Sequence, residues 1–377
     1  MPRPVGSALD QTLRAQASPI PAASPRLGLN FALQDYLALA AHPDLRSAAL
    51  DALHRHGPGA ASRRALEDRL AAFLQLRAAA TFASGTEAIR QTFRALLRDD
   101  DHVILDSDAH SAMFETVFLA GAHPHRSPAG SVEGVERRLI RLSRQPRRGR
   151  LVIALPAVSA YGSRIADLAE LSALARQYGA LLIVDVTHDL GAMGPGGGVA
   201  EIQACQGRVD ILLGSLAKTF GAAAGFAAFR DPGLKAALPD GHSAAPPPAN
   251  AAAILAALDL VAGPEGQRRR RNLHGLSLRL RNHLMADGIR PLGQASPFVP
   301  ILLPLATALP RAALLESAGP RVPLLQAPLV PRHAPRWRIQ LTACSRLTSV
   351  GLCSSQRSMP ISWPLRLLQM TSSGAPG

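Results

Sequence analysis

The strongest constraint on the fold is a series of short apolar runs, each of which ends in small or polar residues. The runs cover residues 79–82, 102–105, 151–155, 181–184 and 211–213. Segments with helical character, such as 87–97 and 167–178, lie between them. Apolar strands that alternate with helices are typical of a mainly parallel sheet buried on both faces. The sequence therefore predicts an α/β protein.

The rest of the chain divides into parts of different character. We expect an N-terminal arm over 1–43, a large domain over 44–262, a small α+β domain over 263–343 and an atypical tail over 344–377. Further helices are predicted at 44–56, 65–76, 249–261 and 267–286, and small-domain strands at 297–305, 322–330 and 337–342. The tail contains no Asp or Glu and has no helical period, so we expect it to be disordered.

The composition excludes several classes of protein. The 377 residues are 47% apolar and 18% charged, which indicates a globular chain. The net charge of +14 does not indicate nucleic-acid binding, because the arginines are scattered and aromatic residues make up only 4%. The densest cluster, 268–271, is expected to be a solvated helix face. No apolar run approaches the roughly 20 residues of a membrane span. Three cysteines without metal or disulfide spacing fit a reducing cytoplasm.

One lysine is unusual in this arginine-rich chain. Of the 41 basic residues only Lys218 and Lys235 are lysines. Arginine can replace lysine in solubility and ion pairing, but it cannot form a Schiff base. Lys218 follows a predicted strand and precedes Gly221, so it lies where an α/β sheet binds its ligands.

The polar residues at the other strand ends complete a recognisable set. Pyridoxal phosphate needs a lysine for its aldehyde, a carboxylate for its ring nitrogen, a helix N-terminus with hydroxyls for its phosphate and a flat partner for its ring. These needs are met, in that order, by Lys218, Asp185, Ser84, Gly85 and Thr86 with Ser215, and His110. Each residue alone also fits a helix cap, a turn or a surface position.

The chain also resembles a known family, the α-oxoamine synthases, which are pyridoxal phosphate enzymes of fold type I. The resemblance extends from about Asn30 to Ala343. The segments that carry it are Asp35 to Leu39 with His42-Pro43, Ser62-Arg63 with Leu66-Glu67, Asp185 to Gly191 with Gly194-Pro195, Ser215 to Lys218 with Gly221 and Gly225-Phe226, and Arg336 to Ala343.

The resemblance implies an aspartate aminotransferase-like fold, a cytoplasmic homodimer and a decarboxylative condensation of Gly, Ala or Ser with an acyl-CoA or acyl carrier thioester. It implies that Lys218 holds the cofactor and moves the α-proton. It further implies roles for Asp185 at the pyridine nitrogen, His110 on the ring, His188 at the phenolic oxygen or the substrate, Thr86 and Ser215 at the phosphate with Ser243 of a second subunit, and Arg338 at the amino-acid carboxylate. No metal is expected.

Several departures from the family pattern leave other functions open. Leu66-Glu67 follows Ser62-Arg63 too closely, residues 156–163 lack the usual acidic groups, and Ala224 stands at a glycine position. An aminotransferase or lyase on the same fold is one alternative. A degenerate, non-catalytic subunit is the other.

Overall fold

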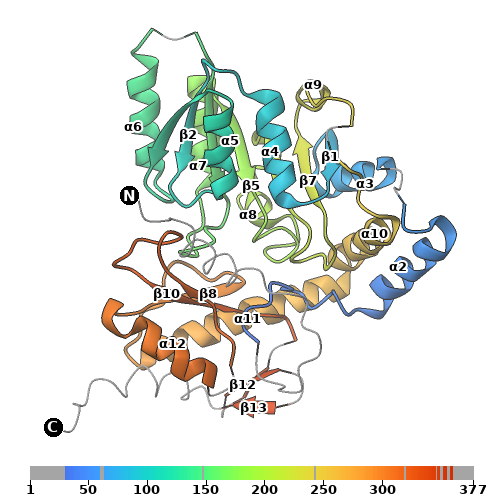
Figure 1. Cartoon of the computed structure of the whole chain (residues 1–377), viewed down its shortest axis with the longest axis vertical. Helices are drawn as coiled ribbons and strands as arrows, with labels where there is room; N and C mark the ends of the chain where they lie inside the picture. The colour runs from blue at the N-terminus through green and yellow to red at the C-terminus, as the bar shows by residue number, and fades with distance from the viewer. Residues whose placement is uncertain are drawn as a thin grey trace, which may run out of the picture.

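The structure is a computed structural model that describes residues 30–59, 63–146, 148–241, 243–317, 320–344, 346–348, 351–354 and 357–359. A large sheet flanked by helices forms one part of the molecule, and a small sheet with its own helices forms the other (Figure 1). The long helix α11 (Pro264–Ala286) begins beside the large part and runs along the small sheet.

The large sheet has seven strands in the order β1-β7-β6-β5-β4-β2-β3. The strands are β1 (Ala78–Phe82), β2 (His102–Asp106), β3 (His123–Ser127), β4 (Leu151–Pro156), β5 (Leu181–Asp185), β6 (Ile211–Ser215) and β7 (Gly225–Phe229). β7 is antiparallel to both β1 and β6, and the remaining neighbours pair in parallel. All strands except β7 therefore end at the same edge, and the predicted mainly parallel α/β fold is confirmed.

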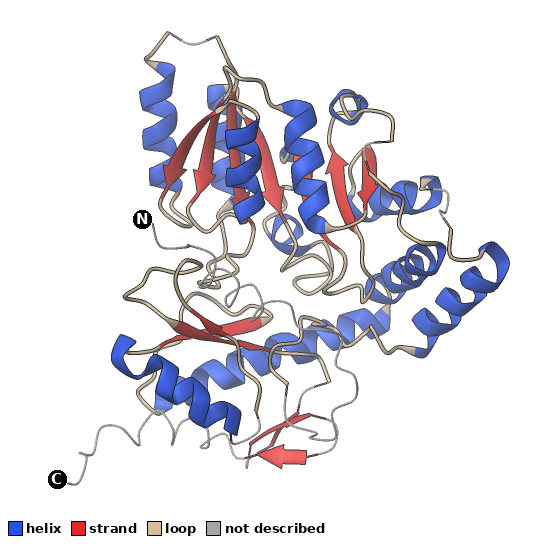
Figure 2. Cartoon of the chain, in the orientation of Figure 1, coloured by secondary structure: helices blue, strands red, loops and turns tan. Residues whose placement is uncertain are grey.

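Helices cover both faces of this sheet (Figure 2). The helices of this part are α2 (Pro43–His56), α3 (Arg64–Leu74), α4 (Gly85–Leu96), α5 (Ser111–Leu119), α6 (Val132–Ser143), α7 (Leu168–Tyr178), α8 (Gly198–Ile202), α9 (Pro232–Ala236) and α10 (Pro248–Ala262). Of these, α2 packs against α10 and lies away from the sheet. Within β2, Val103 and Leu105 join the apolar core under α4 and α5, while Ile104 joins the core under α6 and α7. This alternation is what a strand buried on both faces requires.

The small part contains a three-stranded antiparallel sheet in the order β8-β10-β9. Its elements are β8 (Phe298–Leu302), α12 (Ala308–Ser317), β9 (Leu324–Leu325) and β10 (Arg336–Gln340). The end of the expected N-terminal arm joins this sheet, because Phe31 N donates to Arg321 O at 2.8 Å and Gln340 N donates to Phe31 O at 3.0 Å.

Several expectations for this part need correction. The strand expected over 322–330 is reduced to the two residues of β9, and α12 was not predicted because Pro310 interrupts its sequence. Within the expected tail, β11 (Arg346–Thr348), β12 (Gly351–Ser354) and β13 (Arg357–Met359) pair as antiparallel strands, while 345, 349, 350, 355, 356 and 360–377 lie outside the described residues.

The basic cluster of α11 is not a wholly solvated face. Arg268 and Arg271 are exposed, but Arg269 is half-buried and Arg270 is buried. Arg270 donates to Val261 O at 2.7 Å, and Arg269 donates to the carbonyls of Leu37 and Ala38. Among the described residues, no helix is long and apolar enough to cross a membrane.

Candidate active site

The predicted site residues lie where the parallel strands end. Ser84 follows β1, His110 follows β2, Asp185 ends β5 and Lys218 follows β6. The charges of Asp185 and Lys218 both act on His110, and Lys218 and His110 also act on His188. The fold therefore brings together side chains that are more than a hundred residues apart in the sequence.

Lys218 is held in a state that favours the neutral amine. Burial, followed by the positive charge of Arg338, lowers the pKa of its ammonium group from 10.5 to about 7, while the carboxylate of Asp185 opposes both effects. Within the described ranges, Lys218 has no hydrogen bond or ion pair of its own. A neutral primary amine beside a carboxylate is suited to attack an aldehyde.

His188 lies in a buried environment that the sequence did not predict. Its Nδ1 lies 2.8 Å from the hydroxyl of Tyr36, and the ring of Phe298 approaches it edge-on with centroids 5.3 Å apart. Burial, followed by the charges of Lys218 and Arg338, lowers the pKa of His188 well below its ordinary value. His188 is therefore a neutral imidazole whose orientation is set by Tyr36.

Asp185 and His110 are positioned by local backbone contacts. Oδ1 of the buried Asp185 accepts a hydrogen bond from Thr187 N at 2.9 Å. His110 caps α5, where its Nδ1 accepts from Ala112 N at 3.1 Å. Surrounding protein and the charge of Lys218 lower the pKa of His110, while Asp185 raises it. The ring of His110 remains exposed, so it is available to cover a planar ligand.

The loops after β1 and β6 approach each other so closely that they need glycine. A Cβ on Gly85 would lie 2.7 Å from the Cβ of Ser215, and one on Gly225 would overlap the carbonyl of Ser84. Ser84 caps α4 by accepting from Glu87 N at 3.2 Å, and the half-buried Thr86 lies in the first helical turn. A helix N-terminus with two hydroxyls at its start fits a phosphate group.

Ser243 lies next to the same loop within its own chain. Its Oγ accepts from Ala83 N at 3.2 Å, and Arg63 donates to its carbonyl. A contribution of Ser243 to the site of a second subunit stays a prediction. Ser62 of the expected Ser-Arg pair lies outside the described residues.

Arg338 reaches the site from β10 of the small sheet. Its Nη1 donates to Ala160 O at 3.1 Å, and its guanidinium carbon lies 5.9 Å from the ring centroid of Phe298. Its Nε is buried and has no partner among the described residues. Burial lowers the pKa of Arg338. A buried guanidinium N–H without a partner is suited to donate to a carboxylate, the group with which arginine commonly forms bidentate pairs.

Together these groups fit pyridoxal phosphate: an amine for the aldehyde, a buried carboxylate, a flat exposed ring and a glycine-lined helix N-terminus. The fold and this donor set define a pyridoxal phosphate-dependent transferase of fold type I. The model of the family "aminotransferase class I and II" matches residues 28–349. The chain belongs to this family, within its α-oxoamine synthase branch.

Individual relatives agree with this placement. The 8-amino-7-oxononanoate synthase of Halorhodospira halophila is 36% identical over an alignment of 334 residues that covers 83% of this chain and 81% of that protein. The 8-amino-7-oxononanoate synthase of Anaeromyxobacter dehalogenans is 35% identical over 354 residues, covering 88% and 87% of the two chains. The solved serine palmitoyltransferase of Sphingomonas wittichii has a TM-score of 0.81 at 23% identity, with 96% and 95% covered, and shares the fold. The chain is therefore a pyridoxal phosphate-dependent acyltransferase.

Proposed function

We propose that the enzyme joins alanine to a seven-carbon acyl thioester that ends in a carboxylate. The product named for its relatives, 8-amino-7-oxononanoate, has its amine on C8 and its ketone on C7. Breaking the C7–C8 bond leaves alanine without its carboxyl group and a seven-carbon acyl group. In the reaction the α-carbon of the amino acid bonds to the acyl carbonyl, the thiol leaves, and the carboxyl group departs as CO2.

One observation carries the reaction type in this proposal. Lys218, which forms no ion pair within the described residues, has a pKa of about 7 and is acted on by the charges of Arg338 and Asp185. Lys235 is instead paired with Glu67 at 2.8 Å. A buried amine poised near neutral pH is costly to maintain, and it is what a proton-transferring lysine needs.

The side chains divide the chemistry among them. Lys218 would hold the cofactor aldehyde and would take the α-proton of the amino acid. Asp185 would keep the ring nitrogen of the cofactor protonated, His110 would cover the ring, and Arg338 would bind the substrate carboxylate. When bound, the cofactor supplies an electron sink for the carbanion that forms at the α-carbon.

The remaining contacts orient the cofactor. His188, held by Tyr36, would donate to the phenolic oxygen. Ser84, Gly85, Thr86 and Ser215 would surround the phosphate, with Ser243 close to the same loop. The cap at the N-terminus of α4, the contact between Tyr36 and His188 and the contact between Ala83 and Ser243 support these roles.

The test compares two variants that keep the positive charge, Lys218→Arg and Lys235→Arg. With pyridoxal phosphate, alanine and the seven-carbon thioester, we expect Lys235→Arg to retain a visible absorption band and to release thiol. Lys218→Arg should lose both. Amino-group transfer to a keto acid without thiol release would favour the aminotransferase alternative. A wild-type protein that binds cofactor but releases no thiol from any thioester would favour a degenerate subunit.

Substrate choice is tested with matched pairs. We expect alanine to give faster thiol release than glycine or serine, and the seven-carbon thioester to be a better substrate than palmitoyl-CoA. A preference for serine with palmitoyl-CoA would contradict the proposed substrates while leaving the reaction type intact.

We further infer that the enzyme works as a homodimer in the cytoplasm. The outer face of α2 carries the exposed apolar side chains of Leu50 and Leu53, which favours a covered surface. Cys205 and Cys344 are free thiols, which is consistent with a reducing compartment. Light scattering coupled to size-exclusion chromatography tests the dimer, and a monomeric mass would refute it.

A further inference from the structure

A tight turn from Asp35 to His42, the Tyr36 turn, lies against the loop that follows Lys218. The two carboxylate oxygens of Asp35 accept from Leu39 N at 2.8 Å and Ala40 N at 3.0 Å, and Ala38 adopts a left-handed φ of 54°. A Cβ on Gly221, three residues after Lys218, would lie 2.8 Å from the Cα of Ala40. The backbone of this turn therefore packs against the loop that carries Lys218.

The same turn delivers a side chain into the site. Tyr36 is completely buried, and its hydroxyl lies 2.8 Å from Nδ1 of His188. Its carbonyl accepts from Ala343 N at 2.8 Å. A displacement of the turn would move the hydroxyl that fixes the ring of His188.

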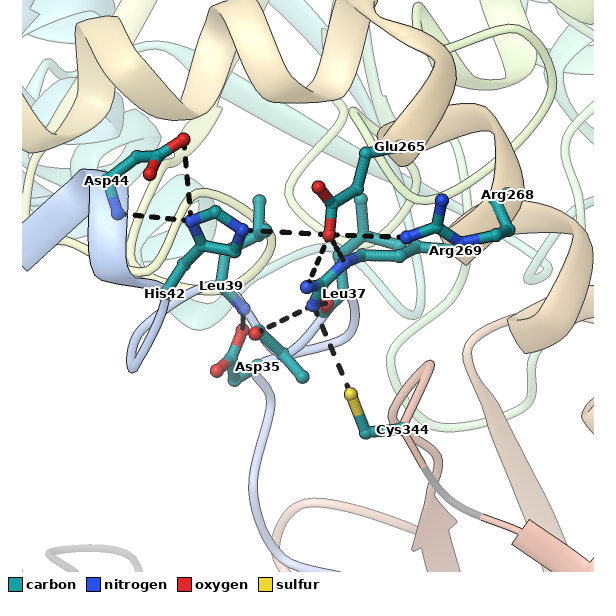
Figure 3. Close-up of polar contacts among 10 residues, drawn as sticks. Asp35, Leu37, Leu39, His42, Asp44, Glu265, Arg268, Arg269 and Cys344 are labelled. Atoms are coloured by element: carbon teal, nitrogen blue, oxygen red, sulfur yellow. Dashed lines mark hydrogen bonds and ion pairs between the residues drawn. The ribbon is translucent and has the colours of Figure 1, made fainter.

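One arginine of α11 holds the turn from outside the site (Figure 3). Nη1 of Arg269 donates to Leu37 O at 2.7 Å and to Ala38 O at 3.0 Å. Its Nε and Nη2 donate to a single oxygen of Glu265, at 2.9 Å and 2.7 Å. Nε2 of His42 lies 3.6 Å from that oxygen, so the far end of the turn meets the same carboxylate.

We propose that Arg269 is a positioning residue. Its hydrogen bonds to the carbonyls of Leu37 and Ala38 hold the Tyr36 turn in place. That turn fixes the contact between Tyr36 and His188 and supports the loop that carries Lys218. This inference rests on the proposed function for the roles of His188 and Lys218. Charged hydrogen bonds to two neighbouring carbonyls in a half-buried position are strong enough to fix a short turn. A lysine cannot hold both the carbonyls and Glu265 with the same geometry.

The first arm of the test needs no cofactor. Hydrogen exchange is measured on the peptide that contains Leu39 and Ala40 in Arg269→Lys and in Arg271→Lys, which alters an exposed neighbour on α11. We expect exchange in Arg269→Lys to be about tenfold faster than in the wild type and exchange in Arg271→Lys to be unchanged. Equal exchange in the two variants would overturn the proposal.

The second arm reads the site itself. The visible band of the bound cofactor is titrated with pH in Arg269→Lys, in Tyr36→Phe and in the double variant. If Arg269 acts through Tyr36, each single variant shifts the midpoint and the double variant shifts it no further than Tyr36→Phe alone. In turnover, kcat should fall about tenfold while KM stays within about twofold. An unshifted midpoint in Arg269→Lys, or fully additive shifts, would overturn the proposal.

Two further outcomes separate the possible failures. If Arg269→Lys does not fold, Glu265→Gln takes its place in both arms, because it weakens the contact that holds the Arg269 side chain. The same faster exchange and the same shift of the pH midpoint are then expected. If the wild type shows no visible band with cofactor, the proposed function fails, while the exchange arm still decides whether Arg269 holds the turn.

Discussion

The pKa of Lys218 is the property on which the chemistry depends most. A free lysine with a pKa of 10.5 would be neutral in about one molecule in 3,000 at pH 7. With a pKa of about 7, half of the molecules carry the neutral amine. The environment therefore raises the reactive fraction by about 1,500-fold. Part of this effect comes from the positive charge of Arg338, which is removed by Arg338→Gln and kept by Arg338→Lys.

The assay is the rate at which the visible band appears when pyridoxal phosphate is added to cofactor-free protein between pH 5.5 and 10. In the wild type the rate should rise with pH through a midpoint near 7. In Arg338→Gln the midpoint should move to higher pH, because the repulsion on the Lys218 ammonium is lost. In Asp185→Asn it should move to lower pH, since that carboxylate raises the pKa. A wild-type midpoint near 10, or no shift in Arg338→Gln relative to Arg338→Lys, would refute the reasoning.

Two further predictions concern stability. Burial raises the pKa of Asp189 to about 8. Between about pH 4 and pH 8, the folded state therefore holds a proton that the unfolded state has released, and the free energy of unfolding falls as the pH rises through this range. Asp189→Asn should therefore stabilise the cofactor-free protein more at pH 9 than at pH 6 in urea unfolding, and an equal effect at both would contradict the assignment. Gly221 and Gly241 share a φ of 69°, but only a Cβ on Gly221 meets another atom within 4 Å. Gly221→Ala should lower the free energy of unfolding by about 2 kcal/mol more than Gly241→Ala. Equal losses would show that the Tyr36 turn moves aside at little energetic cost.

Much of the large sheet could be predicted because its strands are local apolar runs. β5 and β6 are apolar, are bounded by polar clusters and are completely buried along most of their length. β3, with the sequence His-Pro-His-Arg-Ser, was missed because an edge strand needs no apolar pattern. β7 was missed because it is a short run directly after the alanines at 222–224, and its antiparallel direction is set by its neighbours.

For the site, the residues alone single out positions where one residue type is chemically required, and the family resemblance adds His188 and Arg338. Lys218 and Asp185 could be named because few other side chains perform their roles. Tyr36 and Phe298 contact His188 from distant parts of the chain, and no local pattern indicates such a contact. Likewise, the sequence alone indicates a surface arginine at Arg269, because the carbonyls of Leu37 and Ala38 to which it donates lie far away in the chain.

The central claim is that Lys218 holds the cofactor, and the sequence makes a direct test possible because Lys235 is the only other lysine. The holoenzyme is reduced with borohydride, which fixes the cofactor to the amine that holds it, and is then digested and mapped by mass spectrometry. The account predicts the cofactor mass on the peptide that contains Lys218 and none on the peptide that contains Lys235. A cofactor mass on Lys235, or on neither lysine, would contradict it.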